Sequence, residues 1–556
     1  MFTCRISFGS LLGLLVLAFC GCSKTETKPA LPSPPPSPSS SELRTVARVH
    51  WLGRERLDAE PNATNLVAIW KLPESANLAA RVLDKLSLAP WGLQRGSATP
   101  TNPPSDLFRA VLEDILQAEC FLEIRGGTNQ PGELALALRL DAGRAAAWQT
   151  NLATVFESLT GRKPEVAANG WAFTQPHWPA RIELTRAGDW TCFGLAAGSN
   201  GSLGAMTAQL PLFTPAKSAE WLEAEFDALG VSRALGLNWK LPVDWPRLSL
   251  SLASRNGAVQ TRAGLTFAQP LALELADWRF PTNLIHEPLI AFTAVRGLTK
   301  WLDSLPAWKE LPLGSAPSQL FTWALNGIPL QTYLAIPDAD ASNRVEQLSA
   351  ALIERSRSFF ATNTFGKLER TNGVLNWVDF PFLPPSLEAM SLPAGEFIVA
   401  GFSPGARTNR HNPDALMAQF LTRTNLVYYD WEITEPRVEA WIYLGQTLRL
   451  VTRHAQLPPQ GQAQNWLNAL APKLGNSVTA GALTAPNQLT FTRTSSFGFT
   501  ALELQLLADW LASPDFPHGL HSFNAEPDPR LYQVRPRPAG GAAPAPDSPT
   551  PPPAPR

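Results

Sequence analysis

The sequence predicts an α+β protein built from two tandem, similar units, each a mainly antiparallel sheet with helices packed on one face. First, apolar runs typical of strands are interspersed with longer segments whose apolar residues recur at helical spacing. Second, adjacent strands are joined by short connections rich in Gly, Asn and Pro, which favour antiparallel pairing. Third, one pattern of segments occurs twice along the chain. Helices on one face of each sheet would bury the apolar surfaces of both.

The repeat is clearest where residues 187–198 are compared with residues 394–405. Glycines, an alanine, an acidic residue and an aromatic residue recur there in register. Other matching segments keep the same order, namely 66–70 with 289–293, 120–121 with 320–321, and 246–248 with 436–438. Ordered agreement of this kind favours a tandem duplication over chance matching. It sets the two units at residues 44–283 and 284–534.

Each unit is expected to open with a strand and a helix, followed by paired strands and a long amphipathic helix. In the first unit we predict helices at 75–86 and 143–159 and strands at 66–70, 120–125, 133–140, 181–185, 190–195, 247–253 and 259–267. In the second we predict helices at 298–305 and 342–360 and strands at 289–295, 319–326 and 330–336. Residues 215–230 are predicted as a helix that the second unit lacks. Helices at 463–474 and 501–511, around a strand at 488–493, are expected to pack onto the second unit.

Two cysteines remain once the N-terminal region is set aside. Cys120 aligns with Leu320 across the repeat, and Cys192 aligns with Val399, so both occupy positions of strand aliphatics. An oxidising compartment would allow a disulfide between them. Because a free cysteine packs as a small hydrophobic residue, we predict two buried thiols instead.

The N-terminus carries one early positive charge, an apolar run over Leu11–Phe19, and then Gly21 followed by Cys22. The run is too short to span a bilayer, which takes about 20 residues. This arrangement resembles a bacterial lipoprotein signal, in which a small residue precedes the lipid-acceptor cysteine. The resemblance implies that residues 1–21 are removed and that Cys22 is lipidated. An ordinary cleaved signal peptide without a lipid is the alternative.

The same resemblance implies that the protein is located in the bacterial cell envelope, where it is anchored to the membrane through lipid and faces the periplasm. Ser23 follows the acceptor cysteine and favours the outer membrane. Residues 22–43 and 535–556 are rich in Pro with few large apolar side chains, so we expect a disordered spacer and a disordered tail. In general form the chain is similar to large envelope lipoproteins of bacteria, a likeness that carries no functional residue across.

The charge balance argues against nucleic acid as a partner. The chain has 46 basic and 47 acidic residues and no run of Lys or Arg, whereas nucleic-acid binding requires a basic footprint. The abundant Trp residues fit either a core or a stacking surface. The partner classes that remain are therefore the membrane itself, a protein and a hydrophobic ligand.

One segment matches the G-x-S-x-G pattern of a serine nucleophile, at Gly401–Gly405. In that motif the residue after the serine donates its backbone N–H to the oxyanion. Here that residue is Pro404, which has no N–H. The segment that follows reads as a loop, where the motif requires a helix. We therefore expect a turn here and no catalytic Ser403.

Other clusters give no stronger site. His518 and His521 lie in a Pro/Gly-rich loop without further metal-ligand neighbours. The segment 338–342 resembles the start of a calcium loop but lacks its glycine and its last glutamate, so helix capping is the better interpretation. The pairs Glu432 with Glu435 and Asp430 with Glu439 are expected to be solvated. We predict no catalytic residue, metal or cofactor.

The sequence thus favours a non-enzymatic envelope lipoprotein that binds a ligand or scaffolds a complex. The alternative is a hydrolase of an envelope polymer or ester, with a site assembled from residues distant in sequence. Two features of the structure discriminate between them. Converging acidic groups in a polar cleft would favour the enzyme, and an apolar cavity between helix and sheet would favour a lipid or hydrophobic-peptide carrier.

Overall fold

The computed structural model describes residues 43–517 with several gaps. The gaps are residues 93–101, 128–131, 175–180, 197–201, 211–219, 237–243, 283, 298, 305–315, 327–330, 363–365, 380–384, 403–412, 452–461 and 514–515. The described part is an α+β fold in which twenty strands form one sheet. Every pairing between them is antiparallel.

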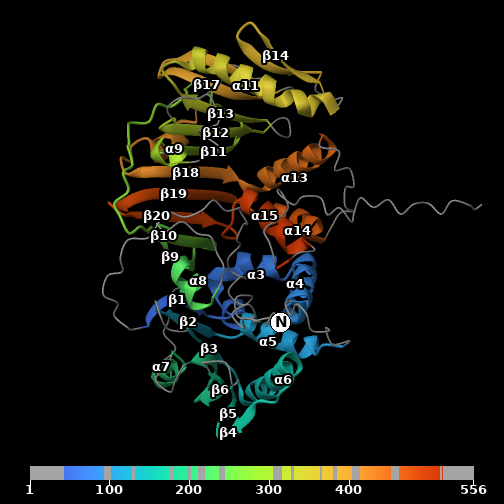
Figure 1. The fold of residues 1–556 in the computed structure, drawn as a ribbon. Coiled ribbons are helices and arrows are strands. Elements are labelled where there is room, and N and C mark those ends of the chain that lie inside the picture. The colour runs from blue at the N-terminus through green and yellow to red at the C-terminus, as the bar shows by residue number, and fades with distance from the viewer. Residues whose placement is uncertain are drawn as a thin grey trace, which may run out of the picture.

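The sheet runs the length of the molecule, with β14 and β4 at its two ends (Figure 1). One half has the order β4 (Glu165–Ala167), β5 (Gly170–Thr174), β6 (Arg181–Ala187), β7 (Trp190–Ala196), β3 (Glu133–Arg139), β2 (Cys120–Gly126), β1 (Arg44–Trp51), β8 (Glu220–Asp227), β9 (Arg247–Arg255) and β10 (Ala258–Thr266).

The other half continues the sheet from β10. Its order is β20 (Gln488–Ser495), β19 (Asn476–Ala485), β18 (Leu426–Ile433), β11 (Leu289–Arg296), β12 (Gln319–Leu325), β13 (Thr332–Pro337), β17 (Gly395–Phe402), β16 (Pro385–Leu392), β15 (Val374–Val378) and β14 (Lys367–Thr371). Read from its outer edge inwards, each half therefore has the same succession of ten strands.

Helices connect the strands in both halves. The first half has α2 (Arg54–Asp58), α3 (Thr64–Trp70), α4 (Pro73–Gly92), α5 (Ser105–Gln117), α6 (Ala142–Thr160), α7 (Ser202–Gln209) and α8 (Ala228–Ala234). The second has α9 (Thr299–Ser304), α11 (Ala341–Thr362), α12 (Asp414–Phe420), α13 (Thr434–Val451), α14 (Gln462–Leu470) and α15 (Ala501–Ala512). Short 3₁₀ turns cover Pro61–Ala63 and Ala471–Lys473.

Helices cover both faces of the sheet, which corrects the prediction that they pack on one face only. In β3, the alternate residues Leu134, Leu136 and Leu138 face α5 and α6, whereas Ala135 and Ala137 pack with α7. In β17, Ile398 packs with α11 while its neighbours Phe397 and Val399 share a core with α12. Strand side chains alternate between faces, so a sheet apolar on both sides requires cover on both.

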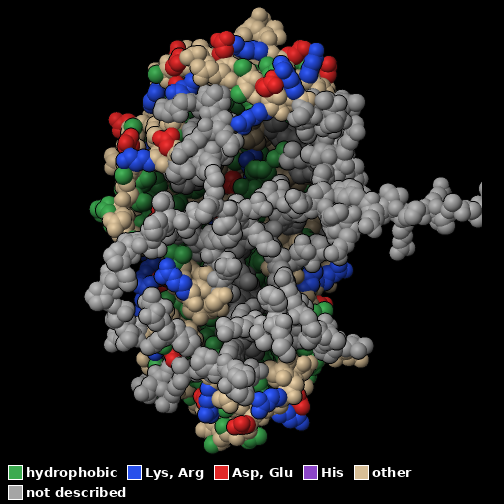
Figure 2. Space-filling view, viewed as in Figure 1, with side chains coloured by type: hydrophobic (Ala, Val, Ile, Leu, Met, Phe, Trp, Pro, Cys, Tyr) green, Lys and Arg blue, Asp and Glu red, His purple; other side chains and the backbone are tan. Residues whose placement is uncertain are grey.

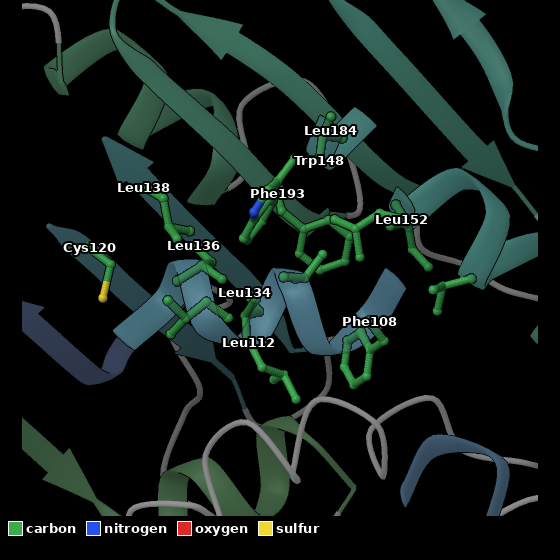
Figure 3. Close-up of a cluster of buried hydrophobic side chains, with 14 of the residues drawn as sticks. Phe108, Leu112, Cys120, Leu134, Leu136, Leu138, Trp148, Leu152, Leu184 and Phe193 are labelled. Carbon is green, nitrogen blue, oxygen red and sulfur yellow. The ribbon is translucent and has the colours of Figure 1, made fainter. Parts of the chain in front are cut away.

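The core of the first half lies between the sheet and the helices α4, α5 and α6 (Figure 3). Its apolar side chains come from strands and helices alike, including Phe108, Leu112, Leu138, Trp148 and Phe193. Trp148 is 1% exposed, and its indole N–H donates to Asp114 Oδ2 at 2.7 Å. Asp141 caps the first turn of α6 by accepting from the Arg144 N–H.

The last helices join the two halves, whereas the sequence had placed them on the second half alone. One apolar cluster combines Ile69 and Leu78 of α3 and α4 with residues of α13, α14 and α15. The Trp466 indole N–H donates to Ser75 Oγ at 3.0 Å, which ties α14 to α4. Lys85 of α4 donates to the carbonyl oxygens of Leu511 and Ser513 at the end of α15.

Two predicted elements of the first half are wrong. Residues 66–70 form helix α3, with Leu66, Val67 and Ile69 buried, and the first strand is Arg44–Trp51 instead. Residues 220–227 form strand β8 although Trp221 and Phe226 have helical spacing. Pairing with β1 on one side and β9 on the other supplies hydrogen bonds that local propensity cannot offset.

The proposed equivalence of 246–248 with 436–438 is also wrong. Arg247 begins strand β9, whereas Arg437 lies in helix α13. The strand in the place of β9 is β19, and α13 follows β18 as α8 follows β8. The second half therefore contains a counterpart of β8, namely β18, although the sequence comparison predicted that the second unit lacks the segment 215–230.

Cys120 and Cys192 are free thiols buried in the two strands β2 and β7, which confirms the prediction. Burial raises the pKa of each thiol to about 12. Within the residues that the structure describes, no helix is both long enough and apolar enough to cross a bilayer.

We predict that a thiol-reactive chromogenic disulfide labels neither cysteine in the folded chain. The thiolate is the reactive form, and both burial and the raised pKa keep its population low. A chain beginning after Cys22 should give two thiols in urea and none without it. Val166→Cys is the control, because that side chain is 93% exposed and should react at once. Rapid labelling of the unaltered folded chain would contradict the buried positions.

Candidate functional site: a central apolar cavity

The strongest candidate site is a cavity of about 1070 Å³ where the two halves of the sheet meet. Its floor is formed by seven neighbouring strands, from β1 through β8, β9, β10, β20 and β19 to β18. Residues of α3, α4, α5, α14 and α15 cover it. The volume lies just above the range of about 300–1,000 Å³ that small-molecule sites occupy.

The lining is mostly aliphatic and aromatic, and both halves supply it. The aromatic members are Trp51, Trp70, Trp221, Tyr428, Trp466, Phe491, Phe497 and Phe499. Leu116 and Phe499 line the cavity and are 43% and 39% exposed, so apolar side chains reach its opening. On the face shown in Figure 2, charged side chains lie at both ends of the molecule and along its sides, and hydrophobic ones are visible in the hollows between.

Gly481 leaves room for two aromatic side chains on the part of the cavity floor that the second half forms. Gly481 of β19 lies between Tyr428 and Phe491 on the neighbouring strands. A Cβ at this position would come within 2.5 Å of the Phe491 ring and 3.1 Å of Tyr428 Cβ. The small residue therefore lets the two rings approach across the strand, with centroids 6.1 Å apart.

The polar end of the cavity is an ion pair between Arg493 of β20 and Glu503 of α15. The guanidinium donates to the two carboxylate oxygens at 2.6 and 2.9 Å, and its Nε donates to Thr479 Oγ1 at 2.8 Å. A further N–H donates to the Gly498 carbonyl oxygen at 3.0 Å. Such a bidentate pair fixes orientation as well as charge, so α15 is held against the sheet at one place.

The start of α15 is fixed by two further carboxylate contacts. Thr500 and Glu503 form a capping box, in which each side chain accepts from the backbone N–H of the other. Glu432 of β18, 5% exposed, accepts from the Ala501 N–H at 2.7 Å. Acidic groups are favoured at a helix N-terminus. The covering helix is thus positioned by residues that lie beside the cavity.

Asp430 and Glu432 are buried side by side on the face of β18 that carries Tyr428, which corrects the prediction that they are solvated. Burial raises the pKa of both carboxyls, that of Glu432 to about 7, and the charge of Asp430 adds to the effect on Glu432. Burial likewise lowers the pKa of Arg437, against the attraction of the two acids. Asp430 accepts from the Thr293 hydroxyl at 2.7 Å. Neither acid lines the cavity.

The remaining carboxylates of the predicted pairs are not brought to this site. Glu435 and Glu439 lie on α13, and neither lines the cavity. In the segment once compared with a calcium loop, Asp338 accepts from the Asp340 N–H at 2.8 Å and pairs with Arg344 at 2.6 Å. Within the described ranges, no three His, Cys, Asp or Glu side chains are grouped so as to hold a metal ion.

Several predicted positions lie outside the described residues. They are the lipid-acceptor Cys22, Ser403 with Pro404, and the two histidines His518 and His521. Gly401 and Phe402 end strand β17, so the G-x-S-x-G segment begins at the end of a strand.

A second polar cluster lies on the other face of the first half. His50 Nε2 contacts Glu119 Oε1 at 3.1 Å, and Arg56 and Arg139 lie 3.4 and 3.3 Å from the other oxygen of Glu119. Burial acts to raise the pKa of Glu119, but His50 and the two arginines together lower it. The His50 ring stacks on Phe121 at 4.0 Å. His50, Arg56 and Arg139 all stabilise the negative charge of Glu119, so we interpret the cluster as structural.

Comparisons of the chain with protein families, with curated proteins and with solved structures gave no match. The cavity itself was not predicted from the sequence. The one signal of it is the abundance of Trp, 19 residues in all, of which four line the cavity.

We predict that Glu432→Gln changes how stability depends on pH. Because the pKa of the folded carboxyl is raised from 4.5 to about 7, Glu432 costs the fold stability as pH rises through that window. The amide keeps an acceptor for the Ala501 N–H and has no charge. The variant should therefore gain on the order of 2–3 kcal/mol relative to the unaltered chain between pH 4.5 and pH 8. Urea unfolding at both pH values measures this.

The control for this experiment is Glu439→Gln, on an exposed position of the neighbouring helix α13. It should leave the difference between the two pH values unchanged. Parallel pH profiles for the Glu432 variant and the unaltered chain would show that this carboxyl does not titrate abnormally in the fold.

Proposed function

We propose that this chain is a non-enzymatic, lipid-anchored protein of the bacterial cell envelope that binds a hydrophobic small molecule of the lipid class in its central cavity. The single observation that carries the proposal is the cavity of about 1070 Å³ between helices and sheet, with its aliphatic and aromatic lining. Sites of this kind bury most of an apolar ligand and use a few polar groups to orient it.

The contacts of the buried acids favour binding over hydrolysis. A typical glycoside hydrolase would need two acidic groups that converge on an open cleft. Asp430 and Glu432 are instead 7% and 5% exposed, and each accepts a hydrogen bond from a structural donor, Thr293 Oγ1 or the Ala501 N–H. Arg493 and Glu503 are likewise paired with each other at the cavity wall. These pairings leave the described lining without a free acid–base couple.

The proposal includes the tandem duplication that the sequence suggested. One half of the sheet has ten strands, with β4 at its outer edge and β10 at the junction. The other half has ten strands in the corresponding order, with β14 at its outer edge and β20 at the junction. The helices α8 and α13 follow equivalent strands, as do α7 and α12. In a duplicated chain the two copies meet at β10 and β20, and the binding cavity is built at that junction.

We predict that Ala79→Trp blocks the cavity. Ala79 of α4 lines the cavity and is itself exposed, so an indole there extends into open space without overpacking the core. Binding of the neutral dye Nile red, followed by its fluorescence, should weaken at least tenfold. Ala76→Trp is the matched control, since Ala76 is exposed on the same helix and does not line the cavity. Equal dye binding by all three chains would contradict the assignment of this cavity.

We predict that Cys22→Ala moves the protein from the membrane fraction to the soluble fraction of a bacterial host. Several acyl chains on one cysteine give stable anchoring, at about 0.8 kcal/mol for each buried CH₂, and alanine has no thiol to acylate. Mass spectrometry of the mature N-terminus checks the acyl mass on residue 22. Cys20→Ala should leave anchoring intact. A mature chain that starts elsewhere without fatty acid would contradict the tether.

A further inference from the structure

The charged groups of the cavity wall are already neutralised. Among the described residues that line it, Arg493 and Glu503 are the only charged side chains, and they form a bidentate pair with each other. The remaining polar lining residues are Ser75, Thr261 and Thr479, with the phenol of Tyr428. A ligand in this cavity therefore meets an apolar wall with hydroxyl groups and no unpaired charge.

Four of the five N–H donors of Arg493 are already engaged. Its Nε donates to Thr479, one terminal nitrogen donates to Gly498 and Glu503, and the other donates to Glu503. The side chain of Arg493 is 15% exposed, and that of Glu503 is 42% exposed. Bidentate capture of a carboxylate or phosphate by Arg493 would displace one of these acceptors, and the anion would lie beside the like charge of Glu503.

The charges around the pair do not create a positive field either. Asp430 and Glu432 lie on β18, which is separated from β20 by β19, and Arg437 lies on α13 next to them. Lys85, on the far side of the cover, donates to the carbonyl oxygens at the end of α15. Burying an ion without a partner costs several kcal/mol or more, so a charged head group is disfavoured at every described part of this wall.

We propose that the ligand is an amphiphile with an uncharged, hydrogen-bonding head group, such as an acylglycerol or a long-chain alcohol. This inference rests on the proposed function and specifies its substrate class. The apolar chain lies along the floor of the first half, over Leu250, Leu252 and Val259. The head group lies at the hydroxyl-rich end near Thr261 and Thr479, where the Thr261 Oγ1 is buried without a hydrogen-bond partner in the described structure.

The test compares three amphiphiles that share one hexadecyl or hexadecanoyl chain and differ in head-group charge. They are monohexadecanoylglycerol, hexadecyl sulfate and hexadecyltrimethylammonium, each used below its micellar concentration to displace Nile red from the full mature chain. The neutral amphiphile should compete at a concentration at least tenfold lower than either ion. Equal or better competition by an ion would overturn the inference while leaving the cavity as a binding site. Failure of all three to compete, with no dye bound, would instead overturn the proposed function.

Glu503→Gln gives the matched variant. A glutamine at this position can still complete the capping box of α15, but it leaves the charge of Arg493 uncompensated at the cavity wall. The preference for the neutral amphiphile over hexadecyl sulfate should then fall at least tenfold. Glu220→Gln, on a strand beside the cavity but outside its lining, should leave the preference unchanged. An unaltered preference in a folded Glu503 variant would show that the ion pair does not set the head-group selectivity.

Discussion

The architecture depends on the backbone pairing of β10 with β20, which makes two sheets into one. Eight residue pairs join these strands, from Val259 with Ser495 to Thr266 with Gln488. Because the pairing is continuous, the middle of the sheet has no edge at which a small unit could end. Its apolar face therefore needs cover from helices of both halves. The helices α4, α14 and α15 provide that cover through their own contacts, and the space that they leave over the strands is the cavity.

The same continuity brings polar residues into one row across the sheet. Cross-strand pairing places Thr293 beside Asp430, Asp430 beside Thr479, Thr479 beside Arg493, and Arg493 beside Thr261. Within this row Thr293 donates to Asp430 and Arg493 donates to Thr479, whereas Thr261 Oγ1 and Asp430 Oδ2 have no hydrogen-bond partner in the described structure. Towards the first half the row continues as Leu252 and Leu222. The boundary between polar and apolar positions thus falls at the cavity, which gives it one polar end.

Much of the fold could be predicted from the sequence because its signals are local. The hairpin of β2 and β3 and the long helices α6 and α11 match the predicted segments, since their apolar spacing and short turns need no distant partner. Strand β8 could not be recognised in this way. Its Trp221 and Phe226 fit a helix equally well, and its strand conformation depends on β1 and β9, which lie far away in sequence.

The candidate site could not be predicted from the sequence for the same reason, because it combines residues that lie far apart in the chain. Its lining combines Trp51 and Trp70 from near the start of the described chain with Trp466 and Leu511 from near its end. The burial of Asp430 and Glu432 was missed because a strand with two acids looks solvated unless both of its faces are known to be covered. What the sequence did supply was the criterion that an apolar space between helix and sheet favours a carrier over an enzyme.

Under the proposed function, the energetics of the cavity favour an apolar ligand. The space of about 1070 Å³ opens to solvent beside the exposed side chains of Leu116 and Phe499, so water can enter it. Water in it faces Leu, Val and Trp side chains, and each Å² of that surface taken from water gains about 25 cal/mol. An apolar chain recovers this free energy without disturbing the Arg493–Glu503 pair, whereas a polar solute would leave the same walls wet. Under the proposed function, the walls would thus favour an apolar ligand before any specific hydrogen bond is made.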